Sequence, residues 1–271
     1  MVIGASTGVG RALAEALARQ GMNVALVASD IEEISILSND LAIRYQILVR
    51  SYVEDLSDYK FDPLQLFSKI HNEMGDVHYL FYPAGYVSDQ DYGVISESDL
   101  ERTILVNQLS AMKLVSSWLQ NQGQGESEGE GQIQIQDQGQ DQYQIPNKEQ
   151  GRNGGLKTIV LFSSIAALVP RSRNMVYASA KAGLEYFALG VRHWLGDKNT
   201  ILQVYALGYV DTGMSFGQKL LFPVVHPEEV ANVVVKNLDK DFGKKYYPGY
   251  WFWIVTVLRQ LPWMIYKKLK F

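Results

Sequence analysis

Tyr177 and Lys181 are the two side chains whose types and spacing most clearly suggest acid–base chemistry. On a helix, residues four positions apart project from the same face, with Cβ atoms about 5–6 Å apart. A tyrosine titrates near a pKa of about 10, and a neighbouring ammonium lowers that pKa toward the working pH. Ser164 lies upstream and supplies a hydroxyl that can hold a substrate oxygen beside the phenol. We therefore predict that Tyr177 exchanges a proton with a substrate oxygen.

A glycine-rich loop stands at the start of the chain, where Gly4, Gly8 and Gly10 follow the apolar residues 1–3. The helical pattern of residues 11–19 comes next, so the order is strand, glycine turn and helix, as in dinucleotide-binding motifs. Glycines let the backbone take positive φ and approach a pyrophosphate closely. The N-terminus of the helix offers free N–H groups to the phosphates. The loop therefore predicts a dinucleotide site.

In this order and at this spacing, the two motifs resemble the short-chain dehydrogenase/reductase family, apart from one insert and the C-terminal tail. Ser164, Tyr177 and Lys181 match the family's catalytic triad, and Asn107 matches the helix asparagine that supports its proton relay. The resemblance implies hydride transfer between a nicotinamide and a carbonyl or alcohol. It also implies contacts of Asp55 with the adenine and of Val210 and Thr212 with the carboxamide. The implied cofactor-binding residues are Gly4, Ser6, Thr7, Gly8, Val9, Gly10, Ser29, Asp55, Leu56, Ala84, Gly85, Tyr177, Lys181, Val210 and Thr212.

Three segments depart from the family pattern. The first strand is short and ends in Ile3, and Leu207-Gly208 replaces the Pro-Gly after the sixth strand. Tyr82-Pro83 replaces two asparagines whose side chains steady the cofactor floor in the family. None of these changes deletes a catalytic group. They bear on cofactor binding more than on the chemistry.

The end of the second strand bears on the choice of cofactor. By register, Ala28 occupies the position of the acidic residue that selects NAD in the family, and Ser29 the position often taken by arginine in NADP enzymes. Asp30 stands one step further, where it can cap the next helix. The pattern favours NADP, and a register shifted by one residue would favour NAD.

Apolar segments alternate with helical patterns along the chain. We expect strands at 23–28, 45–49, 78–82, 157–162 and 201–206, and helices at 31–43, 63–74, 97–119, 176–195 and 227–238. This alternation predicts an α/β fold, a doubly wound parallel sheet of Rossmann-like type in a single domain. The active site is then expected at the C-terminal ends of the strands. We assign residues 1–248 to this catalytic domain, 122–155 to an insert within it, and 249–271 to an amphipathic C-terminal tail.

Composition narrows the remaining classes of function. The 271 residues include no cysteine, and the four histidines have no metal-ligand spacing, so we expect no metal site. The net charge of −4 gives no reason to expect a nucleic-acid partner. Residues 1–30 lack the pattern of a signal peptide, which favours a cytoplasmic protein. The expected partner is a small carbonyl or alcohol substrate.

The insert at 122–155 is built almost entirely from glutamine, glycine and other polar residues. Such a segment cannot bury enough apolar surface to offset the entropy of ordering. We interpret it as a flexible surface loop, with a partner-binding loop as the alternative.

The tail at 249–271 interleaves aromatic and basic residues and contains no acidic side chain. Its apolar run is too short to span a bilayer. One interpretation is contact with a membrane surface, which would make a lipid-like carbonyl substrate more plausible and the protein membrane-associated. The other is that the tail packs over the substrate pocket or against another subunit of a homo-oligomer. The stretch 213–223 ends in Leu220, Leu221 and Phe222, which hints at an apolar substrate.

Two other classes of function stay open. A nicotinamide-binding fold of this type can serve as a non-catalytic sensor or scaffold, for which the altered Tyr82-Pro83 segment is the main support. Alternatively, the tail and the insert together would suit an adaptor at a membrane surface.

Overall fold

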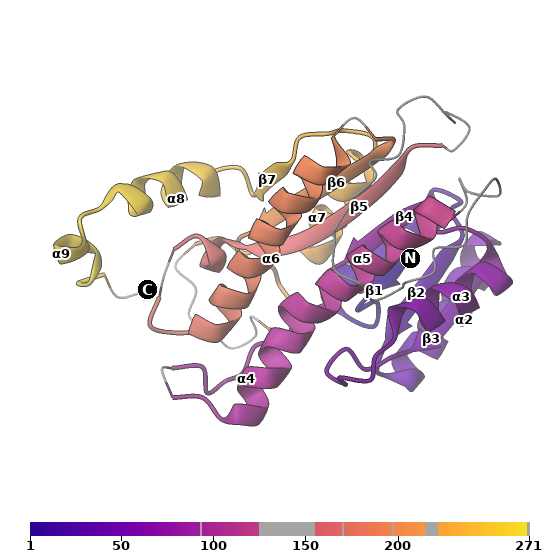
Figure 1. The fold of residues 1–271 in the computed structure, drawn as a ribbon, viewed down its shortest axis with the longest axis horizontal. Helices are drawn as coiled ribbons and strands as arrows, with labels where there is room; N and C mark the ends of the chain where they lie inside the picture. The colour runs from indigo at the N-terminus through magenta and orange to yellow at the C-terminus, as the bar shows by residue number, and fades with distance from the viewer. Residues whose placement is uncertain (93, 125–154, 170, 197, 215–221, 270–271) are drawn as a thin grey trace, which may run out of the picture.

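The computed structural model describes the chain except residues 93, 125–154, 170, 197, 215–221 and 270–271. Its centre is a seven-stranded, all-parallel sheet with the strand order β3-β2-β1-β4-β5-β6-β7, covered by helices (Figure 1). The strands are β1 (Val2–Ile3), β2 (Val24–Ala28), β3 (Val49–Val53), β4 (Tyr79–Tyr82), β5 (Lys157–Ser164), β6 (Thr200–Leu207) and β7 (Lys244–Tyr247). The longer helices are α1 (Gly8–Arg19), α2 (Ile31–Tyr45), α3 (Pro63–Met74), α4 (Glu97–Ile104), α5 (Ser110–Gln124), α6 (Met175–Leu195), α7 (Pro227–Val235) and α8 (Trp251–Gln260). The short ones are the π-helix η1 (Leu105–Leu109), the 3₁₀ turn η2 (Ile165–Ala167) and α9 (Trp263–Tyr266).

The sheet is buried on both faces, which explains why its central strands are almost continuously apolar. Successive residues point to opposite faces, so Ile3 joins one core and Val2 the other. The first core lies under α3, α5 and α6 and includes the fully buried Trp118 of α5. The second lies under α1, α2 and α7, where Leu13 and Val230 pack. The predicted doubly wound parallel fold in a single domain is confirmed.

The order of the strands reverses between β1 and β4, which are neighbours in the sheet although two strands separate them in the chain. The loop after β1 leads to α1 on one face, and the chain after β4 leads to α4 and α5 on the other. Loops that diverge in this way leave a crevice at the carboxyl ends of the strands. The fold therefore forms a crevice at the place where the cofactor site is predicted.

One predicted strand is wrong. The segment 45–49 was chosen for its apolar residues, but α2 runs to Tyr45 and Gln46 ends it in the left-handed conformation. The strand follows at Val49–Val53, where only Val49 and Tyr52 are buried and β3 lies at the edge of the sheet. An edge strand is partly exposed to solvent, so it need not form the continuous apolar run that marks a central strand.

Other observed helices and strands also differ from the predicted ones. The helix predicted at 97–119 is divided by the π-helix η1, whose extra residue per turn has no signature in the apolar spacing. Strand β7 and helix α8 were not predicted as elements. Most of the insert at 122–155 and most of the stretch 213–223 lie outside the described residues, so the predictions made for them stay predictions.

Candidate active site

A crevice of about 530 Å³ opens at the carboxyl ends of the strands, lined by the segments that follow β1 to β6. Every residue predicted to be catalytic or cofactor-binding lines this crevice, except Asn107. The predicted residues come from six separate segments of the chain, so only the parallel sheet brings them together. The glycine loop follows β1. Ser164 ends β5, and Tyr177 and Lys181 belong to α6.

The glycine loop is packed so closely that side chains would not fit. Gly4 has a φ of +83°, and a Cβ there would lie 2.8 Å from the Cα of Ala84. A Cβ on Gly10 would lie 1.9 Å from the carbonyl oxygen of Gly4, so any side chain would break the turn. Thr7 at the N-cap of α1 makes no side-chain hydrogen bond to the first turn. The first N–H groups of α1 therefore keep their capacity to bind an anion beside this bare backbone.

Helix α6 carries both Tyr177 and Lys181, and its start is held by a residue from a distant loop. Asn174, at the N-cap position, is left-handed and provides no side-chain cap. The carboxylate of Asp91, which is 1 % exposed, instead accepts hydrogen bonds from the backbone N–H groups of Val176 at 2.9 Å and Tyr177 at 3.1 Å. The backbone oxygen of Asp91 also accepts from the Asn174 N–H at 2.7 Å. The turn that bears the predicted catalytic tyrosine is thus tied to the segment after β4.

Lys181 is buried at 3 % exposure without a carboxylate partner among the described residues. Its Nζ donates to the carbonyl oxygens of Phe162 at 3.0 Å and Ala84 at 3.4 Å, which lie at the ends of β5 and β4. The same Nζ lies 5.9 Å from the centroid of the Tyr177 ring. Burial lowers the pKa of Lys181 from 10.5 to about 8. The ammonium is therefore directed into the crevice by two backbone carbonyls and retains capacity for a further acceptor.

The Ser164 hydroxyl lies near the Tyr177 phenol and helps to lower its pKa, and both side chains line the crevice. Ser164 ends β5, and its Oγ also accepts from the N–H of Ala166 at 3.1 Å, which orients the hydroxyl. Burial raises the pKa of Tyr177, and the Ser164 hydrogen bond and the charge of Arg171 offset this only in part. The expectation that Lys181 lowers the pKa of Tyr177 below its ordinary value is thus wrong for this structure, because desolvation outweighs the neighbouring charges.

Asn107 does not line the crevice. It lies fully buried in the π-helix, where its Nδ2 donates to the backbone oxygens of Tyr86 at 2.6 Å and Thr103 at 2.9 Å. Its Oδ1 accepts from the N–H of Tyr86 at 3.2 Å. A Cβ on Gly85 would lie 3.2 Å from this Oδ1 and 3.8 Å from the Nζ of Lys181. Asn107 therefore holds the segment after β4 directly behind the lysine, and its part in a proton relay stays a prediction.

The Tyr82-Pro83 departure removes two asparagines but adds a different tether. The buried Tyr82 hydroxyl donates to the backbone oxygen of Val106 at 2.7 Å, which ties β4 to the π-helix. Burial raises the pKa of this phenol, so it remains a neutral donor. The floor of the crevice is consequently supported from η1 without the family's asparagines.

Strand β2 ends at Ala28, where the sequence predicts its end. Ala28 ends the strand, Ser29 lines the crevice, and the Asp30 carboxylate caps α2 by accepting from the N–H of Glu33 at 3.0 Å. The capping role predicted for Asp30 is confirmed. At the end of β3, Asp55 accepts from the N–H and hydroxyl of Ser57 at 2.8 and 2.7 Å, and these bonds lower its pKa.

Sequence reasoning missed two residues of this region. Arg171 lines the crevice near Tyr177, and Asp91 caps the catalytic helix. Neither belongs to a motif. The capping role of Asp91 has no sequence signal, because the caps that can be predicted lie next to their own helix.

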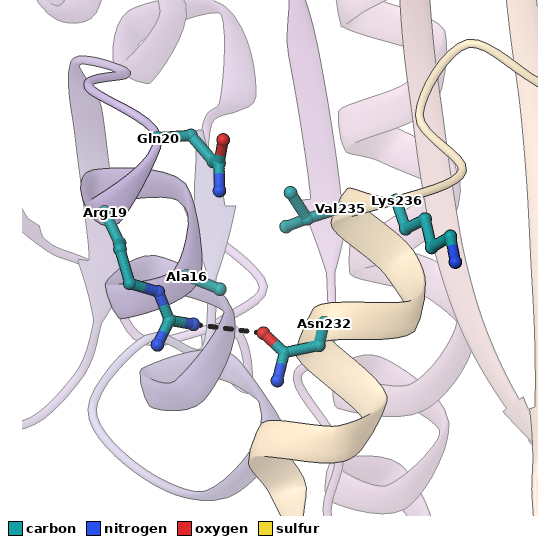
Figure 2. Close-up of a pocket in the computed structure, with 6 residues that line it drawn as sticks. All are labelled: Ala16, Arg19, Gln20, Asn232, Val235 and Lys236. Carbon is teal, nitrogen blue, oxygen red and sulfur yellow. Dashed lines mark hydrogen bonds between the residues drawn. The ribbon is translucent and has the colours of Figure 1, made fainter.

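A second hollow of about 320 Å³ lies on the far side of α1, against α7 (Figure 2). Its wall is stabilised by a hydrogen bond of 3.0 Å from the Arg19 guanidinium to the Asn232 side-chain oxygen. None of the predicted site residues lies here. No group of three or more potential metal ligands occurs in the part of the chain that the structure describes.

A parallel α/β sheet with a glycine cradle and a Ser-Tyr-Lys cluster at the carboxyl ends of its strands defines a Rossmann-like nucleotide-binding protein. The family model for short chain dehydrogenases matches residues 1–133 and 146–219, so the chain belongs to that family of oxidoreductases.

The chain is similar to several known proteins, all at low sequence identity. The inactive hydroxysteroid dehydrogenase-like protein 1 of Pongo abelii is 24 % identical over 257 residues, which cover 93 % of this chain and 68 % of the relative. The 3-oxoacyl-acyl-carrier-protein reductase of Aquifex aeolicus is 24 % identical over 247 residues, 87 % of each chain. A short-chain dehydrogenase from Sphingobium yanoikuyae, solved with NADPH, has the same fold, with a TM-score of 0.73 at 17 % identity over 99 % of this chain and 95 % of that one.

Proposed function

We propose that this protein is an NADPH-dependent reductase of an apolar or lipid-like ketone or aldehyde. The observation that carries the proposal is the convergence of Ser164, Tyr177 and Lys181 on the same crevice as the glycine cradle. The short-chain dehydrogenase of the same fold that was solved with NADPH supports the class of cofactor. A nicotinamide bound in the crevice supplies or accepts a hydride.

The residues present fit a dinucleotide. Gly4 and Gly10 leave bare backbone where a phosphate must come close, and a Cβ on either would collide with neighbouring backbone. Lys181 is a buried cation that among described residues donates only to carbonyl oxygens, as suits a residue that holds ribose hydroxyls. Ser29 offers a hydroxyl and no carboxylate at the end of β2, which favours NADP because a carboxylate would repel a 2′-phosphate.

Tyr177 is the proposed acid. Because burial raises its pKa, the phenol is protonated at neutral pH and can donate its proton to the oxygen of a carbonyl substrate. The Ser164 hydroxyl lines the same crevice beside this phenol, so it can hold the same substrate oxygen. The Lys181 Nζ lies 5.9 Å from the centroid of the Tyr177 ring and is the proposed countercharge for the phenolate that proton donation leaves.

The proposed apolar character of the substrate is supported by the crevice wall beyond Ser164. Ile165 and Tyr209 line the crevice and also belong to an apolar cluster with Trp251 and Val255 of α8. This part of the wall has little to offer a polar substrate. Trp251 and Val255 belong to the first part of the tail, so this part packs against residues of the crevice wall.

The test is a titration of the purified chain with NADPH and with NADH, followed by nicotinamide fluorescence, and then turnover assays with apolar ketones. We expect tighter binding of NADPH and oxidation of NADPH in the presence of ketone. Tighter binding of NADH would contradict the choice of cofactor. Failure to bind either cofactor would contradict the proposal as a whole.

A second candidate is a non-catalytic nicotinamide-binding sensor or scaffold. It is favoured by the name of one relative, an inactive hydroxysteroid dehydrogenase-like protein. The cluster of Ser164, Tyr177 and Lys181 in this chain supports catalysis instead. Cofactor binding without turnover of any apolar ketone or alcohol would favour the sensor.

A further inference from the structure

Helix α8 is apolar on two opposite faces, and only one of them is covered. Trp251 and Val255 form the inner face, with 3 % and 2 % of their surfaces exposed. The indole of Trp251 packs edge to face on Tyr209 and Phe222, with ring centroids 5.5 and 4.8 Å away. A helix that is hydrophobic all round is normally buried all round, so the outer face of α8 requires an explanation.

The outer face of α8 and the following α9 carry the exposed side chains that we call the aromatic patch. Trp253 and Val257, one turn apart on α8, are 70 % and 60 % exposed. Trp263 and Met264 of α9 are 68 % and 74 % exposed. Figure 1 shows both helices at one end of the molecule, extending away from the sheet. The full patch comprises Phe252, Trp253, Val257, Trp263, Met264 and Ile265.

The charged residues within α8, α9 and the residues that follow them are all positive. Arg259 follows the patch on α8, and Lys267 and Lys268 follow it on α9, all three exposed. No aspartate or glutamate occurs in the sequence after Asp241. The body of the protein has the opposite balance, since the whole chain carries a net charge of −4. The patch therefore presents a local positive field to whatever it contacts.

We propose that the aromatic patch binds the surface of an anionic lipid bilayer, with α8 and α9 lying in the plane of the interface. Tryptophan side chains are well suited to the headgroup region, and arginine and lysine pair there with lipid phosphates. A second copy of this chain would bring the same positive charges together, which disfavours the patch as a dimer contact. Among the described helices, none is long and apolar enough to cross a bilayer, so the geometry is one of surface contact.

The patch lies on a helix that packs against the wall of the crevice. Trp251 contacts Tyr209, which lines the crevice, while Trp253 points outward from the same turn. A bilayer bound to the outer face would therefore lie one helix thickness from the crevice wall. The binding proposed here does not depend on the redox chemistry, so its test can succeed or fail independently of that proposal.

The test is co-sedimentation of the full chain with two kinds of vesicle, phosphatidylcholine alone and phosphatidylcholine with phosphatidylserine in equal parts. We expect binding at least about tenfold tighter to the anionic vesicles, weakening as salt is added, because each basic residue near the surface contributes to the attraction. Binding equally weak to both vesicles, or no binding, would overturn the proposal.

Matched variants locate the contact. The double variants Trp253→Ser/Met264→Ser and Lys267→Glu/Lys268→Glu should each weaken binding to anionic vesicles by about tenfold or more. The control Ile36→Ser/Ile43→Ser removes two exposed apolar side chains from α2 and should leave binding unchanged. NADPH affinity and the far-ultraviolet circular dichroism spectrum report whether each variant is folded.

Two results would contradict the proposal that the aromatic patch is the site of membrane contact. Equal loss in the control would mean that binding is unspecific. A dimer of the wild type that becomes a monomer in the Trp253→Ser/Met264→Ser variant, without any binding of vesicles by the wild type, would assign the patch to a second copy of the chain.

Discussion

The carboxylate of Asp91 accepts a hydrogen bond of 3.1 Å from the backbone N–H of Tyr177. The two residues are 86 positions apart in the chain, the contact is partly buried, and Asp91 itself is 1 % exposed. Because the same carboxylate also binds the N–H of Val176, it caps α6 from outside the helix. The start of α6 sets where the Tyr177 ring stands relative to Ser164. We therefore regard Asp91 as a positioning residue for the proposed chemistry.

This relationship predicts that Asp91→Ala lowers kcat by about tenfold or more, because displacements on the order of an ångström at a reacting group cost up to about a hundredfold. The affinity for NADPH should change little, and Asp91→Asn, which keeps one acceptor oxygen, should recover much of kcat. Steady-state kinetics with a fluorescence titration measure both quantities.

The matched control is Asp62→Ala. Asp62 caps α3 by accepting from the N–H groups of Leu64 at 2.9 Å and Gln65 at 3.3 Å, away from the crevice. Loss of either cap should cost roughly 1 kcal/mol of stability. If Asp62→Ala lowered kcat as much as Asp91→Ala does, the effect would be one of stability and the positioning role would be wrong.

Tyr177→Phe tests the proposed proton transfer. Removal of the phenolic hydroxyl should lower kcat/KM by about 10²–10⁴-fold, because a positioned acid contributes that much to proton transfer. NADPH affinity should be retained. The control is Tyr186→Phe on the same helix, where the side chain is exposed and outside the crevice, and which should keep full activity. Equal losses of affinity and of turnover in Tyr177→Phe would point to a structural role.

Lys181 has a pKa of about 8 in the folded protein, lowered from 10.5 by burial. Because the unfolded chain holds the proton up to the higher pKa, it binds more protons between pH 8 and 10.5, and this group makes stability rise with pH there. Below that window the buried ammonium costs the folded state about 3 kcal/mol.

Lys181→Met should therefore raise the free energy of unfolding at neutral pH, by up to about 3 kcal/mol, while lowering turnover. The gain relative to wild type should shrink as the pH rises through the window. Urea denaturation of both proteins at a series of pH values measures this difference. A difference that does not vary with pH would show that the lysine carries no burial penalty.

Ser29→Asp tests the choice of cofactor. A carboxylate at this exposed position at the end of β2 should weaken NADPH binding by about tenfold or more through repulsion of the 2′-phosphate, and should weaken NADH binding much less. Ser29→Ala separates loss of the hydroxyl from gain of the charge. If Ser29→Asp weakened both cofactors equally, the 2′-phosphate would lie elsewhere.

Much of the fold could be predicted because each signal was local. The glycine loop, the YxxxK pair and the buried strands depend on neighbouring residues, and α3 begins and ends where the pattern of Pro63–Met74 predicts. Where a boundary depends on an edge position or on an extra residue per turn, as at β3 and η1, local periodicity was not sufficient.

The sequence alone determined which groups are available for chemistry: the serine, tyrosine and lysine, the bare backbone of the glycine loop, and the basic aromatic tail. Only the tertiary structure decided how deeply these groups are buried and in which direction their pKa values shift. Burial raises the pKa of Tyr177 and lowers that of Lys181, because desolvation depends on what packs around a group and not on its neighbours in the chain. The same holds for the cap that Asp91 provides and for Asn107, which lies behind the crevice: both contacts join segments that only the fold brings together.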